Sequence, residues 1–77
     1  MEIIIGIEKI LREFFDDDSI TINKETTATD IEGWDSLANV QIMLAIEAEY
    51  GIEFSLEEMV GFKNIGDIAN CISKHIN

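Results

Sequence analysis

Apolar residues recur at helical spacing in three separate segments of this 77-residue chain, and no other feature restricts its fold as strongly. In the first segment, the spacing i, i+1, i+4, i+7, i+8 and i+11 places on one helical face Ile3, Ile4, Ile7, Ile10, Leu11 and Phe14. This stripe predicts a first helix. The helix should stop near Asp16, because the three aspartates 16–18 are unfavourable beside the negative end of a helix dipole.

A second helix is expected over residues 36–50, between two strong boundary signals. Asp35 is a good N-cap residue, and Gly51 is a natural helix stop. The stretch between the aspartates and Asp35 is rich in Thr, Asp and Asn and has no helical stripe, so it should form a long ordered loop. Three apolar side chains are candidates to anchor this loop to the core: Ile20, Ile22 and Ile31.

The last third of the chain predicts one short helix and one longer helix. Ser55 and Glu58 have the spacing of a capping box, which would open a helix that ends near Gly61. Asn64 and Asp67 form a weaker signal of the same type. This signal precedes the apolar stripe of a final helix, made of Ile65, Ile68, Ala69, Ile72 and Ile76.

The chain as a whole indicates one small domain. It has no internal repeat, no low-complexity linker and no proline, so residues 1–77 should form a single all-α domain, a small four-helix bundle with a long loop between its first two helices. A domain of this length hides only about 60% of the surface of its unfolded chain. We therefore expect no deep catalytic cleft.

The net charge of −11, from 16 acidic and five basic residues, restricts the partners. Such a charge repels a phosphate backbone and an anionic membrane, so we expect no nucleic-acid partner. It would attract a basic protein surface, although it could equally serve only to keep the domain soluble. We expect a monomer.

No sequence feature predicts export or membrane insertion. No apolar run approaches the roughly 20 residues of a membrane span, and the N-terminus carries Glu2 where a secretory signal would carry positive charge. The lone cysteine, Cys71, lies on an apolar helical stripe and should be a small buried hydrophobe. These features together favour the cytoplasm.

Helix 36–50 differs from the others because its apolar residues fall on two opposite faces. One face is made of Ile42, Met43, Ile46 and Tyr50. The other is made of Leu37, Val40 and Leu44, with Gln41, Ala48 and Glu49 beside them. A helix in a small bundle needs one apolar stripe for the core, so the second is either covered by the long loop or exposed for a partner. We favour exposure.

Few residues are available for catalysis or for metal binding. His75 is the only histidine and lies far from Ser36 in the sequence, so we expect His75 to face solvent rather than to form a Ser-His-Asp arrangement. A calcium loop starting at Asp16 would need glycine where Thr21 stands. No Cys/His cluster suits zinc and no glycine-rich loop suits a nucleotide, so we expect neither a metal site nor an enzyme.

Ser36 remains, at the positive end of helix 36–50. Free backbone N–H groups there favour an attached phosphate over a neutral hydroxyl. A serine at such a place more often only helps to begin a helix. The physical argument by itself leaves both roles open.

The surroundings of Ser36 resemble the family of acyl carrier proteins that bear a 4′-phosphopantetheine arm. Asp35-Ser36-Leu37 resembles the attachment motif of the family, and Gly33 lies two residues before the acid. The stretch AIEAEYGIEF resembles the acidic close of the family's second helix. The short third and longer fourth helices fall at the expected distances, so the resemblance covers essentially the whole chain.

This resemblance implies a carrier without catalysis of its own. A phosphopantetheinyl transferase would use coenzyme A to join the arm to Ser36 through a phosphodiester, which would make the chain a phosphoprotein. The terminal thiol of the arm would then hold an acyl group as a thioester. The resemblance assigns to Asp35 a role in assisting the transfer, and to Leu37 contact with the transferase and later partners.

The resemblance also divides the remaining residues of helix 36–50 and its neighbours into two sets. Acyl-loading and acyl-processing enzymes would dock on Trp34, Leu37, Val40, Gln41, Leu44, Glu47, Ala48, Glu49 and Glu53. The bundle interior could shelter an acyl chain between Ile42, Ile46, Tyr50 and Ile68.

The recognition surface departs from that of carriers in fatty acid biosynthesis. Those carriers usually show acids where Ala38, Gln41 and Ala48 stand here. Partners should therefore depend more on apolar contact than on salt-sensitive ion pairs, and Ala38 and Gln41 should help to tell partners apart. Trp34 is also more typical of carriers in specialised pathways. We hypothesise a stand-alone carrier for a polyketide or other secondary metabolite, a surface polymer or an amino-acid-derived product.

Two alternatives stay open. A peptidyl carrier would hold an aminoacyl thioester on the same arm, although the strong acidity favours acyl carriage. An acidic helical interaction module would leave Ser36 unmodified and use the second apolar face only as a docking groove.

Overall fold

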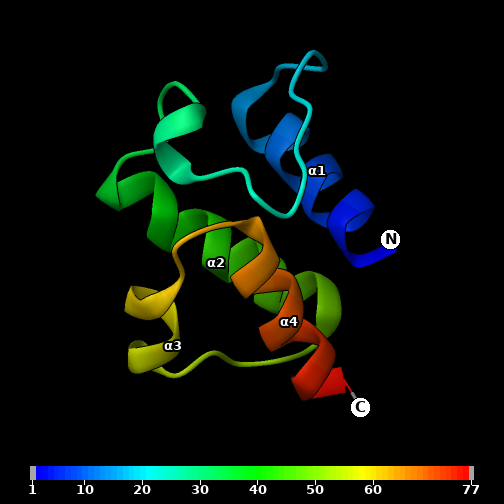
Figure 1. Cartoon of the computed structure of the whole chain (residues 1–77), viewed down its shortest axis with the longest axis vertical. Coiled ribbons are helices and arrows are strands. Elements are labelled where there is room, and N and C mark those ends of the chain that lie inside the picture. Colours follow the sequence, from blue (N-terminus) through cyan, green and yellow to red (C-terminus); the bar gives the residue numbers. More distant parts are fainter. Residues whose placement is uncertain (1, 77) are drawn as a thin grey trace.

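The computed structural model describes residues 2–76, and its helices follow the expected boundaries closely (Figure 1). Helices and connecting loops account for all of these residues, without a strand. The elements follow in the order α1 (Glu2–Phe15), η1 (Ala28–Asp30, a 3₁₀ turn), α2 (Ser36–Tyr50), α3 (Leu56–Gly61) and α4 (Ile65–Ile76). The prediction of a small four-helix bundle with a short third helix is confirmed. None of these helices is both long and apolar enough to cross a membrane.

Side-chain caps account for the boundaries of α2 and α3. The Asp35 carboxylate accepts the backbone N–H of Ala38 at 2.8 Å, so α2 starts one residue after Asp35. Gly51 ends α2 in the left-handed conformation, with φ of 65°. In the predicted capping box, the Ser55 hydroxyl accepts the N–H of Glu58 at 3.1 Å and the Glu58 carboxylate accepts the N–H of Ser55 at 2.8 Å.

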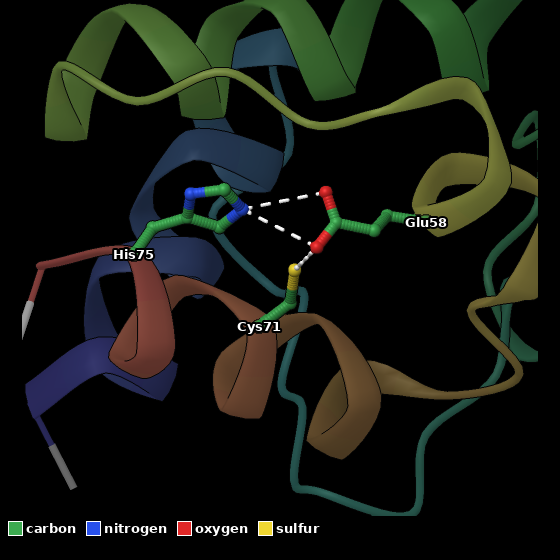
Figure 2. Close-up of side chains that lie close together, drawn as sticks. All are labelled: Glu58, Cys71 and His75. Carbon is green, nitrogen blue, oxygen red and sulfur yellow. Dashed lines mark hydrogen bonds and ion pairs between the residues drawn. The ribbon is translucent and has the colours of Figure 1, made fainter.

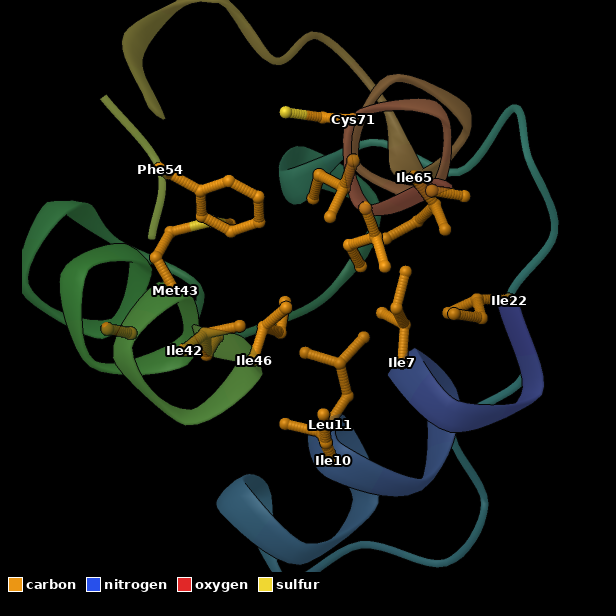
Figure 3. Packing of buried hydrophobic residues seen from close by; sticks show 14 residues of the cluster. Ile7, Ile10, Leu11, Ile22, Ile42, Met43, Ile46, Phe54, Ile65 and Cys71 are labelled. Carbon is orange, nitrogen blue, oxygen red and sulfur yellow. The ribbon is translucent and has the colours of Figure 1, made fainter. Parts of the chain in front are cut away.

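One hydrophobic core lies between α1, α2 and α4 (Figure 3). The largest fully buried side chains come from the predicted stripes of these helices: Ile7, Leu11, Ile42, Met43, Ile46, Ile65 and Ile72. The stripes predict these helices correctly, but the last stripe residue of two of them lies outside the core, since Phe14 is 37% and Ile76 is 49% exposed. Both lie in the last turn of their helix, where fewer neighbouring elements cover a side chain.

The polar face of α1 holds the long loop that leads to α2. The Glu8 carboxylate accepts the N–H of Ile22 at 3.0 Å, and the Arg12 Nε donates to the carbonyl of Ile20 at 2.8 Å. Glu8 and Arg12 also form an ion pair at 3.3 Å. Ile22 is buried, and Ile20 and Ile31 pack against the core, so the three predicted anchors of the loop are confirmed.

The same loop also supports the start of α4. The Ile65 N–H donates to the carbonyl of Thr26 and the Gly66 N–H donates to the carbonyl of Lys24, both at 2.8 Å. These bonds use backbone donors that the first turn of a helix leaves free. The turn η1 in this loop is not foreseen by the sequence analysis, because three residues are too few to show a helical stripe.

Candidate functional site

A sharp turn before α2 presents Ser36 to solvent. Gly33 has φ of 90°, a conformation that glycine adopts without steric cost. Around it, the Trp34 N–H donates to the carbonyl of Ile31 at 3.3 Å, and the Asp35 N–H donates to the carbonyl of Gly33 at 3.1 Å. The turn leaves Ser36 as the first residue of α2, with an exposed side chain.

An open hollow of about 550 Å³ lies beside Ser36, lined by the start of α2 and by α3. Polar groups of Asp35, Ser36 and Asn39 line it near the helix start. The apolar part of its lining includes Val40, Met59 and Val60. A flexible group attached to Ser36 would therefore have both polar and apolar surface within reach.

The electrostatics of Ser36 suit an attached anion rather than a nucleophile. Its hydroxyl lies at the positive end of the 15-residue helix α2. Within residues 2–76, no side chain forms a hydrogen bond with this hydroxyl that would activate it. The nearest candidate base, the Asp35 carboxylate, is already engaged by the Ala38 N–H, and His75 contacts Glu58 instead. Chemistry at Ser36 would need groups supplied by a partner.

The second apolar face of α2 is exposed, as we favour from the sequence. Leu37 is 69% exposed, Val40 51% and Leu44 55%. On the opposite face Ile42, Met43 and Ile46 are fully buried. The prediction of two apolar faces is confirmed, and the outer face begins directly after Ser36.

Two residues of the expected recognition surface have structural roles. Ala38 is 7% exposed and belongs to the core, so the expectation that it helps to distinguish partners is wrong. It faces inward because it lies one helical turn before the buried Ile42. Trp34 is half-buried against the core, and its indole Nε1 donates to the side-chain oxygen of Asn39 at 3.0 Å.

The other expected recognition residues differ in exposure and in whether the side chain already forms a hydrogen bond. Gln41, Ala48, Glu49 and Glu53 are exposed. Glu47 is half-buried, and its carboxylate accepts the N–H of Phe54 at 2.7 Å. This bond holds the segment after α2, so Glu47 has a structural task that the sequence does not reveal.

The short helix α3 adds exposed apolar residues that sequence reasoning missed. Leu56 and Val60 lie one turn apart and are each 77% exposed. The available signal was the length of α3, since a six-residue helix has too little surface to bury both of them. Val60 also lines the hollow beside Ser36, so α2 and α3 together border it with apolar side chains.

The residues expected to shelter an acyl chain lie in or against the packed core. Ile42 and Ile46 are fully buried, and Ile68 is 3% exposed. Tyr50 is half-buried, and its hydroxyl donates to the carbonyl of Ile3 at 3.4 Å. Ile68 also borders a small hollow of about 40 Å³. An acyl chain among these residues would have to separate side chains that now touch.

The structure brings Glu58 of α3 together with Cys71 and His75 of α4 (Figure 2). The Cys71 thiol donates to Glu58 Oε2 at 3.1 Å, and His75 Nε2 lies 3.3 Å from each carboxylate oxygen of Glu58. The His75 ring also meets the edge of Phe54, with centroids 5.9 Å apart. Cys71 is buried and His75 is exposed, both as predicted, but the contact of His75 with Glu58 is not foreseen from the sequence.

Hydrogen bonds within this cluster change the acidity of two members. The N–H of Ser55 and the thiol of Cys71 lower the pKa of Glu58 to about 2. Burial and the neighbouring Glu58 carboxylate raise the pKa of Cys71 to about 11. The sequence could predict only that Cys71 and His75 lie close together, because they are one turn apart on α4. It could not predict the contact with Glu58, which comes from α3.

Comparison with known proteins gives a family for this fold and site. Residues 6–72 match the family model described as "Phosphopantetheine attachment site". The chain is 39% identical over 59 residues to an acyl carrier protein of Clostridium perfringens, covering 77% of this chain and 75% of that one. It is 33% identical over 73 residues to the meromycolate extension acyl carrier protein of Mycobacterium leprae, covering 95% of this chain. The chain spans only 64% of the length of that mycobacterial relative.

A solved structure agrees over nearly the whole chain. The solution structure of holo acyl carrier protein from Geobacter metallireducens superimposes with a TM-score of 0.91 and 39% sequence identity, covering 99% of this chain and 87% of that one. Because the match covers 99% of this chain, it takes in the segments that form the short helix α3 and the long loop between α1 and α2. The chain therefore belongs to the acyl carrier protein family, whose prosthetic group is phosphopantetheine.

Proposed function

We propose that residues 1–77 form one carrier domain that bears 4′-phosphopantetheine on Ser36 and presents an acyl group to partner enzymes. The observation that carries this proposal is the exposed Ser36 at the start of α2, beside the open hollow lined by α2 and α3. When bound, the prosthetic group supplies a thiol that holds the acyl group as a thioester. The residues of the chain bind and orient this group and perform no chemistry on it.

The residues around Ser36 fit a phosphate ester. The first-turn backbone N–H groups of α2 and the positive end of its dipole favour a negative charge at this position. Asp35 caps the helix start through its bond to the Ala38 N–H and so fixes the backbone that carries Ser36. The hollow then offers Asn39 for polar contacts and Val40 and Val60 for apolar ones.

Partner enzymes would dock on an apolar surface that surrounds the attachment residue. On α2 this surface contains Leu37, Val40 and Leu44, and we extend it to Leu56 and Val60 of α3. Exposed acids lie on the same two helices at Glu49 and Glu57, and on the segment between them at Glu53. A partner with an apolar centre and a basic rim would complement it, in keeping with the net charge of −11.

We place this carrier in a specialised biosynthetic pathway rather than in primary fatty acid synthesis. In support, the exposed face of α2 presents Gln41 and Ala48 where fatty acid carriers usually present acids. One relative is named for meromycolate extension. The test is to load the holo form and offer it to a primary fatty acid system. Elongation as efficient as with that system's own carrier would contradict this placement.

The attachment itself is tested by intact mass spectrometry. The full chain is incubated with coenzyme A and a broad phosphopantetheinyl transferase, and one added phosphopantetheine is expected. Ser36→Ala should abolish the addition. Ser19→Ala, which changes another exposed serine in the loop after α1, should leave it intact. No addition to the unaltered chain would leave an unmodified interaction module as the function.

A further inference from the structure

The Glu58, Cys71 and His75 side chains converge from two helices on one point (Figure 2). Cys71 and His75 are four residues apart and share a face of α4, whereas Glu58 lies in the first turn of α3. One carboxylate oxygen, the Cys71 sulfur and a His75 ring nitrogen all lie within 4.8 Å of one another. These three atom types are the protein ligands of zinc.

We propose that these three side chains bind a borderline divalent metal ion, for which Zn²⁺ is the best match. Tetrahedral coordination at the usual zinc–ligand lengths places nitrogen and oxygen ligands about 3.3 Å apart, and sulfur about 3.6 Å from either. The distance from His75 Nε2 to the Glu58 oxygens is 3.3 Å, and Cys71 Sγ lies 3.1 Å from Glu58 Oε2. The third pair, Cys71 Sγ and a His75 ring nitrogen, lies within 4.8 Å, so side-chain rotations that bring these two atoms closer would admit the ion.

The neighbours of the cluster hold the ligands in place. The Ser55 N–H donates to Glu58 Oε1 at 2.8 Å, which orients the carboxylate and leaves Oε2 toward Cys71. The ring of Phe54, itself only 7% exposed, packs edge-on against the His75 ring. A metal site needs this kind of support, because ligands that must be ordered on binding reduce the affinity.

The site is accessible from solvent. An open hollow of about 250 Å³ borders Glu58 and Cys71, and Asp67 and Lys74 also line it. A hydrated ion could enter there, and a water could occupy the fourth coordination position. Three protein ligands leave the fourth position open to water, unlike the four protein ligands that usually close a structural zinc site.

The ligand chemistry selects against the common hard cations. Ca²⁺ and Mg²⁺ prefer sets made only of oxygen ligands, whereas thiolate with imidazole favours zinc and similar ions. Binding replaces the Cys71 thiol proton, which leaves to solvent, and uses the neutral form of His75. The hydrogen bond from the thiol to Glu58 is exchanged for two metal–ligand bonds to the same ion.

Metal binding would fasten α3 to α4. No residue of α3 is fully buried, so this short helix is held by its cap and by the partial packing of Met59 against the core. A bond from Glu58 through the ion to Cys71 and His75 would fix the position of α3. It would thereby also fix Leu56 and Val60, which α3 exposes, independently of whether Ser36 is modified.

The test uses the full chain with Ser36→Ala, so that Cys71 is its only thiol, and Co²⁺ as a spectroscopic probe. We expect thiolate-to-cobalt charge-transfer absorption at one equivalent and its displacement by Zn²⁺. Cys71→Ala should abolish the absorption. His75→Gln should weaken Co²⁺ binding by at least about tenfold. Glu58→Gln should do the same while it retains the capping box, in which glutamine also serves.

A matched control separates this site from the acidic surface. Asp18→Asn removes one exposed acidic charge from the loop after α1 and should leave Co²⁺ affinity unchanged within about twofold. His75→Gln changes an exposed residue of the last helical turn, so it should fold even if a change at the buried Cys71 does not. The absence of charge-transfer absorption in the unsubstituted cluster would overturn the proposal. So would an absorption and affinity that neither His75→Gln nor Glu58→Gln alters.

Discussion

The two faces of α2 are similarly apolar in sequence, but one is buried in the folded chain and the other is exposed. Ile42, Met43 and Ile46 are fully buried, whereas Leu37 and Leu44 are more than half exposed. The inner face meets α1 and α4, whose own stripes need cover (Figure 3). The outer face borders α3, and six residues are too few to cover it. Apolar character alone therefore does not define a core face, since the length of the neighbouring element also decides.

The exposed apolar side chains of the outer face lower the stability that the chain could otherwise reach. Leaving a leucine mostly exposed forgoes on the order of 1–2 kcal/mol of burial free energy. Leu37, Val40 and Leu44 follow one another at helical spacing and form a contiguous apolar patch. In a single domain such a patch usually marks a contact surface. The inner face thus stabilises the fold, and the exposure of the outer face supports our proposal that partners dock there.

The largest expected effect separates the faces by stability. Ile46→Ala removes a fully buried side chain and should lower the free energy of unfolding by about 2–5 kcal/mol, through lost burial and a residual cavity. Leu44→Ala, on the outer face, should change it by no more than about 0.5 kcal/mol. Urea denaturation followed by circular dichroism measures both. Similar losses for the two variants would show that the faces are not distinct.

The second prediction separates the faces by function. Leu37→Ala should lower the kcat/KM of phosphopantetheinyl transfer about tenfold, which corresponds to the loss of one contact of about 1–2 kcal/mol in a docking surface. Ile5→Ala is the matched control, because Ile5 is 63% exposed but belongs to α1. Equal losses of kcat/KM in the two variants would argue that exposed apolar residues act non-specifically.

Much of the fold could be predicted because its boundaries are set by local hydrogen bonds. Asp35, Gly51 and the Ser55–Glu58 capping box act within one helical turn of themselves, so their spacing in the sequence is enough. The core followed from helical periodicity in the same way. The burial of Ala38 agrees with its helical spacing to Ile42, whereas the family resemblance indicates a surface position for it.

Contacts between helices could not be predicted from the sequence. The cluster of Glu58, Cys71 and His75 depends on how α3 lies against α4, and no pattern within either helix specifies that placement. The bond from Glu47 to the N–H of Phe54 depends likewise on the path of the chain after Gly51. A sequence pattern can therefore predict that a polar residue lies on the outside of a helix, but it does not reveal that the side chain binds a residue of another segment.

A third, smaller effect concerns the N-terminal end of the outer face. Asp35→Ala removes the acceptor of the Ala38 N–H and should cost about 1 kcal/mol of stability. Asp35→Asn keeps a capping oxygen and should be close to neutral in urea denaturation. If Asp35 assists the transfer, Asp35→Asn should nevertheless slow phosphopantetheinylation in a rate assay. If the rate of phosphopantetheinylation is the same in Asp35→Asn as in the unaltered chain, Asp35 only caps the helix and does not assist the transfer.

The smallest effect tests whether charge acts on the fold as a whole rather than on one face. The molecule measures 30 × 25 × 22 Å, and its net charge is −11. Exposed charges repel one another over about 30 Å at about 0.01 M salt but over only about 8 Å at about 0.15 M. Added salt should therefore relieve repulsion that otherwise spans the domain. We expect the melting temperature to rise by about 2–4 °C over this range, which corresponds to roughly 0.5 kcal/mol.

Variants of the two faces give this last experiment its control. Leu44→Ala and Ile46→Ala leave the net charge unaltered, so each should show the same rise in melting temperature as the unaltered chain, from its own starting value. A rise confined to the unaltered chain would locate the salt effect in the packing of α2. A melting temperature that does not change with salt in any of them would contradict the view that self-repulsion weakens this fold, because screening acts on every charge of the surface alike.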